Sequence, residues 1–327
     1  MQRRQTLQIA AAALTASALG SGLARAQEWP SRLIKVVVPF GPGGVADVTA
    51  RIVAKQLAEQ LHQSVIVENR PGAGGVVAGE LVARAAPDGC TLLLMSNGTA
   101  VSEGLFKHLP FDPQKDFAPI STLGFFDLAI VVPANSRFKT LADLLAFARA
   151  HPDKLNLGTI NAGSTQNLAA QLFKTTAGIR AQIVPFNGTG AVLTALRSGE
   201  LDAAVEVLSP VMSQIRAGAL RALAVMGEKR SPDLPQVPAV RESGGALASF
   251  NVASWNALAA PAKTPPAMLQ RLNHEVVVAL QSPEVIRSLT EINVQPRPGT
   301  PAQLAELLGA EIRRWGEVIK SAGIPRQ

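Results

Sequence analysis

The chain has 327 residues, of which 31 are Lys or Arg and 24 are Asp or Glu, giving a formal net charge of +7. These charges are scattered, without a basic run or interleaved aromatic side chains, which argues against nucleic acid or an anionic membrane surface as a partner. Cys90 is the single cysteine, so no disulfide can form within the chain, and we expect it to be a small buried apolar side chain.

The first 26 residues are typical of an export signal. Arg3 and Arg4 are followed by an apolar stretch at 9–19 and by a small-x-small cleavage sequence at 24–26. The apolar stretch is shorter than the roughly 20 residues that a permanent membrane anchor needs. We therefore predict cleavage before Gln27 and a periplasmic mature protein without stable membrane anchoring, exported by the Sec or the twin-arginine route.

Strand and helix patterns alternate beyond the signal, which predicts an α/β fold with mainly parallel sheets flanked by helices. A mature chain of about 300 residues favours two lobes over one. Strands are predicted at 34–40, 65–68, 91–95, 128–132, 155–159, 182–186, 201–208, 220–226 and 250–259. Helices are predicted at 47–61, 76–85, 141–150, 166–176, 191–197, 210–217, 266–280, 283–291 and 301–321.

Three glycine-rich loops follow strands and open helices, at residues 40–47, 161–165 and 187–190. The carboxyl ends of strands are where open parallel sheets bind ligands. A helix start carries unpaired N–H groups and the positive end of the helix dipole, and glycine lets a ligand approach the backbone closely. These loops therefore predict a site for a small anion between two lobes that close around it.

An exported dehydrogenase is an alternative interpretation of the first loop. Residues 41–46 fit the dinucleotide pattern G-x-G-x-x-G/A, and Glu68 lies where a ribose-binding acid is expected. Pro39 and Pro42 stiffen this turn, however, and the second half offers no Lys–His pair for hydride transfer. The histidines have no metal-ligand spacing, and the mature sequence has no G-x-S-x-G, P-loop or zinc-binding cysteine pattern. We therefore expect no enzyme activity, no cofactor and no metal site.

Segments along the whole mature chain resemble the Bug (TctC-like) family of periplasmic solute receptors for tripartite tricarboxylate transporters. The resemblance rests on residues 39–44 (PFGPGG) with Asp47 and Arg51, 67–75 (VENRPGAGG), 87–89 (PDG) with Thr91 and Leu92, 184–188 (VPFNG), 223–225 (LAV), 234–238 (LPQVP), 254–255 (SW) and 260–261 (AP). It implies a two-lobed periplasmic binding protein of type II, with lobe 1 at 27–127 plus 253–327, lobe 2 at 128–252 and a cleft between them. Such a receptor captures a small carboxylic acid by hinge closure and presents it to membrane permease subunits, and we expect a monomer.

The resemblance also implies which residues hold the ligand. The loop at 40–47 is expected to bind one carboxylate through backbone N–H groups and ordered water. The loops at 161–167 and 187–189 are expected to close from the other lobe, with Asn97 and Thr159 lining the cleft. The predicted ligand-binding residues are Phe40, Gly44, Val45, Ala46, Asp47, Asn97, Thr159, Asn161, Ser164, Asn167, Asn187, Gly188, Thr189 and Glu206.

Two of these residues have an alternative role. Ser164 is expected either to cap its own helix or to contact the ligand. Asp47 is expected either to cap its helix and pair with Arg51 one turn on, or to hold the bridging waters.

Three positions depart from residues that are common in the family. Asn167 stands in place of His, residues 186–187 are Phe-Asn in place of Tyr-Lys, and residues 205–206 are Val-Glu in place of Phe-Asp. Glu206 would repel a carboxylate unless it takes a proton or the ligand also carries an amine. The sequence therefore does not identify the solute. It is also compatible with delivery to a sensor kinase in place of a permease.

Overall fold

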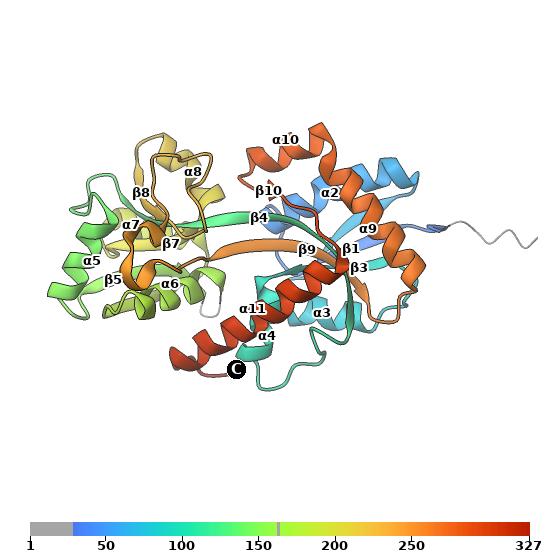
Figure 1. Cartoon of the computed structure of the whole chain (residues 1–327), viewed down its shortest axis with the longest axis horizontal. Coiled ribbons are helices and arrows are strands. Elements are labelled where there is room, and N and C mark those ends of the chain that lie inside the picture. The colour runs from blue at the N-terminus through green and yellow to red at the C-terminus, as the bar shows by residue number, and fades with distance from the viewer. Residues whose placement is uncertain (1–28, 162–163) are drawn as a thin grey trace, which may run out of the picture.

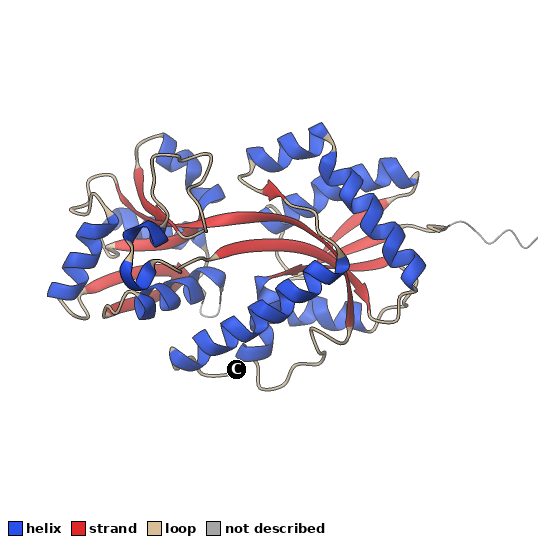
Figure 2. Cartoon of the chain, in the orientation of Figure 1, coloured by secondary structure: helices blue, strands red, loops and turns tan. Residues whose placement is uncertain are grey.

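The computed structural model describes residues 29–161 and 164–327. The predicted export signal at 1–26 lies outside the described residues. The described chain forms two lobes joined by two long strands, β4 (Phe117–Pro133) and β9 (Ala253–Pro261), which run antiparallel beside each other (Figure 1). Helices cover the strands of both lobes (Figure 2), so the predicted α/β class is confirmed.

The first lobe, on the right of Figure 1, is built around a three-stranded parallel sheet that β9 extends in the antiparallel direction. Its strand order is β2-β1-β3-β9. Its remaining strands are β1 (Ile34–Val38), β2 (Val65–Asn69), β3 (Thr91–Ser96) and the short β10 (Gln295–Pro296). Its helices are α2 (Val45–Leu61), η1 (Ala73–Gly75), α3 (Val76–Ala83), α4 (Asn97–Leu105), α9 (Pro266–Gln281), α10 (Pro283–Glu291) and α11 (Pro301–Ser321).

The second lobe repeats the arrangement, with β5 lying between β6 and β7 in parallel. Its strands are β5 (Leu155–Ile160), β6 (Ala181–Phe186), β7 (Ala203–Val207) and β8 (Leu220–Val225). Its helices are α5 (Leu141–Ala150), α6 (Thr165–Thr176), α7 (Thr189–Ser198), α8 (Leu208–Arg216), η2 (Val240–Ser243) and η3 (Gly245–Leu247). Because the carboxyl ends of β5, β6 and β7 share one edge, the starts of α6, α7 and α8 meet there.

Strand β4 belongs to both lobes. It pairs with β9 over residues 117–127 and with β7 and β8 over residues 128–133. The predicted lobe boundary between 127 and 128 falls where β4 changes partners, and the boundary between 252 and 253 falls at the start of β9. One connection is therefore a continuous strand, the other enters β9 at its first residue, and the division into lobes at these residues stays a prediction.

Besides the short elements η1, η2, η3 and β10, which the sequence did not predict, two longer elements differ from the prediction. The Ser-Asn-Gly-Thr segment after β3 has a loop-like composition, yet it starts helix α4, because Ser96 and Thr99 form a reciprocal capping box. The first half of β4 was not predicted either. Pro119 and Gly124 lie inside it, and the register with β9 shifts beside both residues, so the alternating pattern of a strand is interrupted.

Within residues 29–161 and 164–327, the structure contains no helix whose length and apolar character would suit it to span a bilayer.

Candidate functional site

The loop after β1 carries the first group of predicted site residues. Phe40 and Gly44 are exposed, Val45 is half-buried and Ala46 is buried. Gly44 is the N-cap of α2 and provides no side-chain cap. The first N–H groups of a helix have no carbonyl partner inside that helix. The N–H groups at Val45 and Ala46 are therefore not bonded within the helix, and anion binding by this loop stays a prediction.

Asp47 fixes this loop from inside. Its carboxylate accepts hydrogen bonds from the N–H of Gly43 at 2.8 Å, from the Asn69 amide at 2.8 Å and from the Arg51 guanidinium at 3.0 Å. Burial raises the pKa of Asp47, but the hydrogen bonds from Arg51, Gly43 and Asn69 outweigh it and leave the pKa below 3.8. The structure therefore shows the expected pairing with Arg51. The cap of α2 is Gly44, and Asp47 is its third residue.

Asn69 is a residue of this loop network that the sequence analysis missed. Its amide also donates to the carbonyl of Phe40 at 3.0 Å, which ties the end of β2 to the end of β1. The Asn-Arg-Pro-Gly sequence that begins with the last residue of β2 is typical of a turn. The signal that Asn69 has a further role is its position at the end of a strand next to β1.

Three helix starts form the second group, at the edge of the second lobe. Ser164 caps α6 by accepting from the N–H of Asn167 at 3.1 Å, and its hydroxyl donates to the carbonyl of Ile160 at 3.0 Å. The capping role of Ser164 is therefore shown. By contrast, the N-caps of α7 and α8, Gly188 and Val207, provide no side-chain cap.

The buried polar pair of Thr159 and Asn167 lies behind Ser164. The Asn167 amide donates to the Thr159 hydroxyl at 3.0 Å, and both side chains are almost completely buried. Asn161 and Asn187 are exposed at the same edge, and Gly188 is half-buried. The neighbouring residues 162 and 163 of the predicted loop lie outside the described residues.

Glu206, at the end of β7, is 0 % exposed. Its Oε2 accepts a hydrogen bond from the hydroxyl of Thr189 at 3.0 Å. Burial raises the pKa of Glu206 to about 7, while Thr189, the Gln166 side chain and the N–H of Val207 act in the opposite direction. This carboxylate therefore changes its charge near neutral pH.

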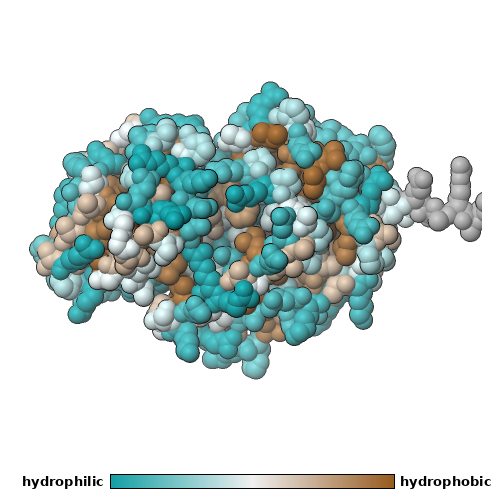
Figure 3. Space-filling view, viewed as in Figure 1, coloured by the Kyte–Doolittle hydropathy of each residue, from teal (hydrophilic) through white to brown (hydrophobic). Residues whose placement is uncertain are grey.

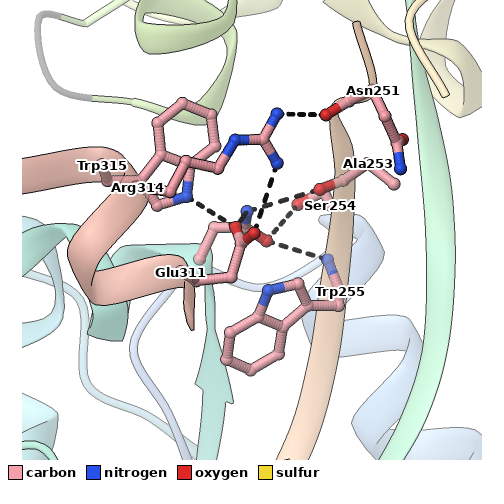
Figure 4. A network of polar contacts seen from close by, with 8 residues as sticks. Asn251, Ala253, Ser254, Trp255, Glu311, Arg314 and Trp315 are labelled. Atoms are coloured by element: carbon pink, nitrogen blue, oxygen red, sulfur yellow. Dashed lines mark hydrogen bonds and ion pairs between the residues drawn. The ribbon is translucent and has the colours of Figure 1, made fainter. Parts of the chain in front are cut away.

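Asn97 starts α4 and belongs to a buried network, while an added Cβ at its neighbour Gly98 would lie 3.9 Å from the Phe40 ring of the first group. Asn97 is 0 % exposed, its amide donates to Glu311 at 3.2 Å, and its oxygen accepts from the N–H of Trp255 at 3.0 Å. Figure 4 shows that the contacts of this network join α11, through Glu311 and Arg314, to the start of β9. The side chain predicted to line the cleft thus connects the last helix to a strand that links the lobes.

The structure therefore assembles the predicted residues in two places, the start of α2 in the first lobe and the starts of α6, α7 and α8 in the second. The molecular surface is indented between the two lobes at the top of the view in Figure 3. Among the described residues, no cluster of three or more His, Cys, Asp or Glu side chains could hold a metal ion.

Comparison with known proteins assigns the chain to a family. A family model described as "Tripartite tricarboxylate transporter family receptor" matches residues 49–324. The chain belongs to this receptor family. Among its relatives, a UPF0065 protein encoded in the tcbD–tcbE intergenic region of Pseudomonas sp. (strain P51) is 35% identical over 317 residues, covering 97% of this chain and 94% of the relative. Protein BugT of Bordetella pertussis is 34% identical over 300 residues, covering 91% of each chain.

Solved structures of receptor-family proteins have the same fold. An R. palustris protein with adipate is 33% identical, with a TM-score of 0.81, over 92% of this chain and 100% of that one. MatC from Rhodopseudomonas palustris with bound malate is 34% identical, with a TM-score of 0.76, over 89% and 100%. The periplasmic binding protein BugD is 28% identical, with a TM-score of 0.78, over 91% and 100%. The predicted family and the predicted periplasmic-binding-protein fold are confirmed.

Proposed function

We propose that this chain is a periplasmic receptor that binds a small carboxylic acid between its lobes, without changing it, and delivers it to the membrane subunits of a tripartite tricarboxylate transporter. The observation that carries this proposal is the uncapped start of α2, which leaves backbone N–H groups for an anion at an exposed glycine loop. Relatives of the same family hold adipate and malate, both carboxylates, in their solved structures.

Backbone groups suit reversible capture. The N–H groups at a helix start attract a carboxylate through hydrogen bonds and the helix dipole, without a lysine or arginine that would hold it as an ion pair. The one acid of the loop, Asp47, is turned inward and its charge is matched by Arg51. Its carboxylate therefore supports the loop without competing for the N–H groups of Val45 and Ala46.

Closure supplies the second half of the site in this proposal. The lobes are joined through β4 and β9, and hinge motion at these few connecting residues moves one lobe against the other. Register shifts in β4, between Thr122 and Gly124 in its pairing with β9 and between Ile130 and Val131 in its pairing with β8, place irregular backbone on both sides of this connection. Hinge closure brings the starts of α6, α7 and α8 toward the loop at 40–47, so that a ligand is enclosed from both sides.

Substitution of Gly44 tests the carboxylate site without breaking the fold. Gly44 has a φ of −77°, which every residue tolerates, and the nearest atom to an added Cβ is the Gly41 carbonyl oxygen at 4.0 Å. Gly44→Leu should therefore fold normally while its side chain shields the N–H groups at the start of α2. We expect it to abolish the thermal stabilisation that the best of adipate, malate, succinate and 6-aminohexanoate gives the wild type.

Gly316→Ala is the matched control, because an added Cβ at Gly316 in α11 also has no neighbour within 4 Å. This variant should keep the full ligand-induced shift. Unchanged stabilisation of Gly44→Leu would remove the α2 start from the site.

Delivery is tested separately: deletion of the gene should abolish uptake of the bound acid, and normal uptake would contradict the transport role. The acid should be recovered unchanged, and denatured protein should release no nucleotide.

A further inference from the structure

Glu206 is an acid at the edge of the second lobe where α6, α7 and α8 start, and this edge is proposed to face an anion. Glu206 lies at the carboxyl end of β7, beside the uncapped starts of α7 and α8. It is fully buried, and within the described residues its Oε1 has no hydrogen-bond partner of ordinary geometry. The contributions of Thr189, Gln166 and the Val207 N–H do not offset the desolvation of this carboxylate, so its burial costs stability and calls for a functional explanation.

Thr189 connects this carboxylate to the surface. It is half-buried at the first position of α7, and its hydroxyl donates to Oε2 of Glu206 at 3.0 Å. A hydroxyl has a single proton to donate and two lone pairs that accept. Because the proton is committed to Glu206, the Thr189 oxygen presents only acceptor capacity to a molecule outside.

The same carboxylate also occupies the favourable position for an anion in this lobe. The starts of α7 and α8 attract negative charge, and Glu206 already places a negative charge between them when it is ionised. With a pKa of about 7, Glu206 is largely ionised at slightly alkaline pH. A second ligand carboxylate at this position would meet repulsion there, and it would also find no donor at Thr189.

We propose that the Thr189–Glu206 pair makes this receptor select an acid whose far end carries a hydrogen-bond donor, an ammonium or a hydroxyl group, over an acid with a second carboxylate there. This proposal rests on the proposed function, since it assumes that the start of α2 holds the first carboxylate. It names the substrate class as amino or hydroxy monocarboxylates, which differs from adipate, the dicarboxylate held by one relative. Glu206 acts through Thr189, as a positioning residue.

Matched ligand pairs test the proposal. Each pair has the same chain length and one shared carboxylate: succinate with 4-aminobutanoate, glutarate with 5-aminopentanoate, and adipate with 6-aminohexanoate. Affinities are measured by calorimetry on the mature wild-type protein at about pH 8, above the pKa of Glu206. In the pair whose length fits, the amino acid should bind at least about tenfold more tightly than the diacid.

Variants show whether the pair sets this preference. In Glu206→Gln the new amide can donate to the Thr189 oxygen, which frees the hydroxyl proton for a ligand carboxylate, so the preference should shrink at least about tenfold or reverse. Thr189→Val should lose the preference, and Thr189→Ser, which keeps the hydroxyl, should retain it. A merely structural role for Glu206 would weaken both ligands of a pair alike.

Three results would overturn the proposal. The first is a wild-type protein that binds the diacid as tightly as the amino acid, and the second is a ratio unchanged in Glu206→Gln; either leaves the carboxylate receptor itself intact. The third is a wild type that binds no member of any pair, which would refute the proposed function and this proposal with it.

Discussion

The carboxylate of Asp47 accepts a hydrogen bond from the N–H of Gly43, four residues earlier, at 2.8 Å. This contact folds the glycine-rich loop back onto the helix that it opens. Asn69 extends the contact to β2, since its amide reaches both Asp47 and the carbonyl of Phe40. The loop is therefore held in one shape before any ligand arrives, which lowers the entropic cost of binding.

Removal of Asp47 should cost both stability and binding. Asp47→Ala leaves the Gly43 N–H and the Asn69 amide without their partner, so we expect the free energy of unfolding to fall by about 2–3 kcal/mol. Arg51 is half exposed, and Arg51→Ala should cost no more than about 1 kcal/mol. Urea denaturation of both variants checks the difference, and equal losses would contradict a central role for the carboxylate.

Neighbouring glycines should respond oppositely to the same substitution. Gly43 has a φ of +83°, so Gly43→Ala forces a left-handed alanine and should lower stability by roughly 1–2 kcal/mol. Gly44 has a φ of −77°, so Gly44→Ala should be neutral or stabilise by about 0.4–1 kcal/mol, because it restricts the unfolded chain. Thermal unfolding compares the pair, and a larger loss from Gly44→Ala would contradict the loop geometry.

Stability should fall as the pH rises through the titration of Glu206. Burial raises its pKa from 4.5 to about 7, while the groups that act against this shift, Thr189, Gln166 and the Val207 N–H, are neutral. The folded chain therefore binds more protons than the unfolded chain between these values, and the free energy of unfolding decreases with pH across that window. Glu206→Gln should be more stable than wild type above pH 7, by an amount on the order of 3 kcal/mol at most, and the difference should vanish near pH 4.

Asp127 provides the comparison for this pH effect. Burial, with repulsion from Asp233, raises its pKa to about 6. Asp127→Asn should therefore remove a pH dependence that lies lower, between 3.8 and about 6. Urea midpoints measured from pH 4 to pH 8 for both variants separate the two groups. A Glu206→Gln variant that keeps the wild-type slope between pH 6 and 7 would show that Glu206 titrates normally.

Asn97 should matter for the fold more than for the ligand. Asn97→Ala removes the donor to Glu311 and the acceptor for the Trp255 N–H inside a buried network, so we expect a loss of about 1–3 kcal/mol in unfolding free energy. Affinity for the bound acid should change less than about threefold. Calorimetry on the variant at low temperature measures this, and a loss of binding with normal stability would instead support the sequence prediction that Asn97 lines the cleft.

The sequence predicted most of the fold because its local signals agree with the packing. The final three helices begin at Pro266, Pro283 and Pro301, and the stripe of α2 has the spacing of a helix with one buried face. Helix α4 escaped prediction because its capping residues are also turn residues. The first half of β4 escaped because Pro119 and Gly124 interrupt it.

The site was predictable where the backbone carries the chemistry. The loop at 40–47 could be inferred from its glycines and from its position between a strand and a helix. The roles of side chains could not, because they depend on partners distant in sequence. Asn97 meets Glu311, more than two hundred residues away, and Asp47 meets Asn69 from the next strand. No local pattern reveals such contacts.

Backbone amide resonances at the start of α2 give the most direct test. In a ¹⁵N–¹H titration with whichever of the acids above binds most tightly, the amide signals of Gly44, Val45 and Ala46 should shift strongly, because their N–H groups donate to the carboxylate. These shifts should saturate together with binding. An acid that binds and leaves all three signals in place would contradict it.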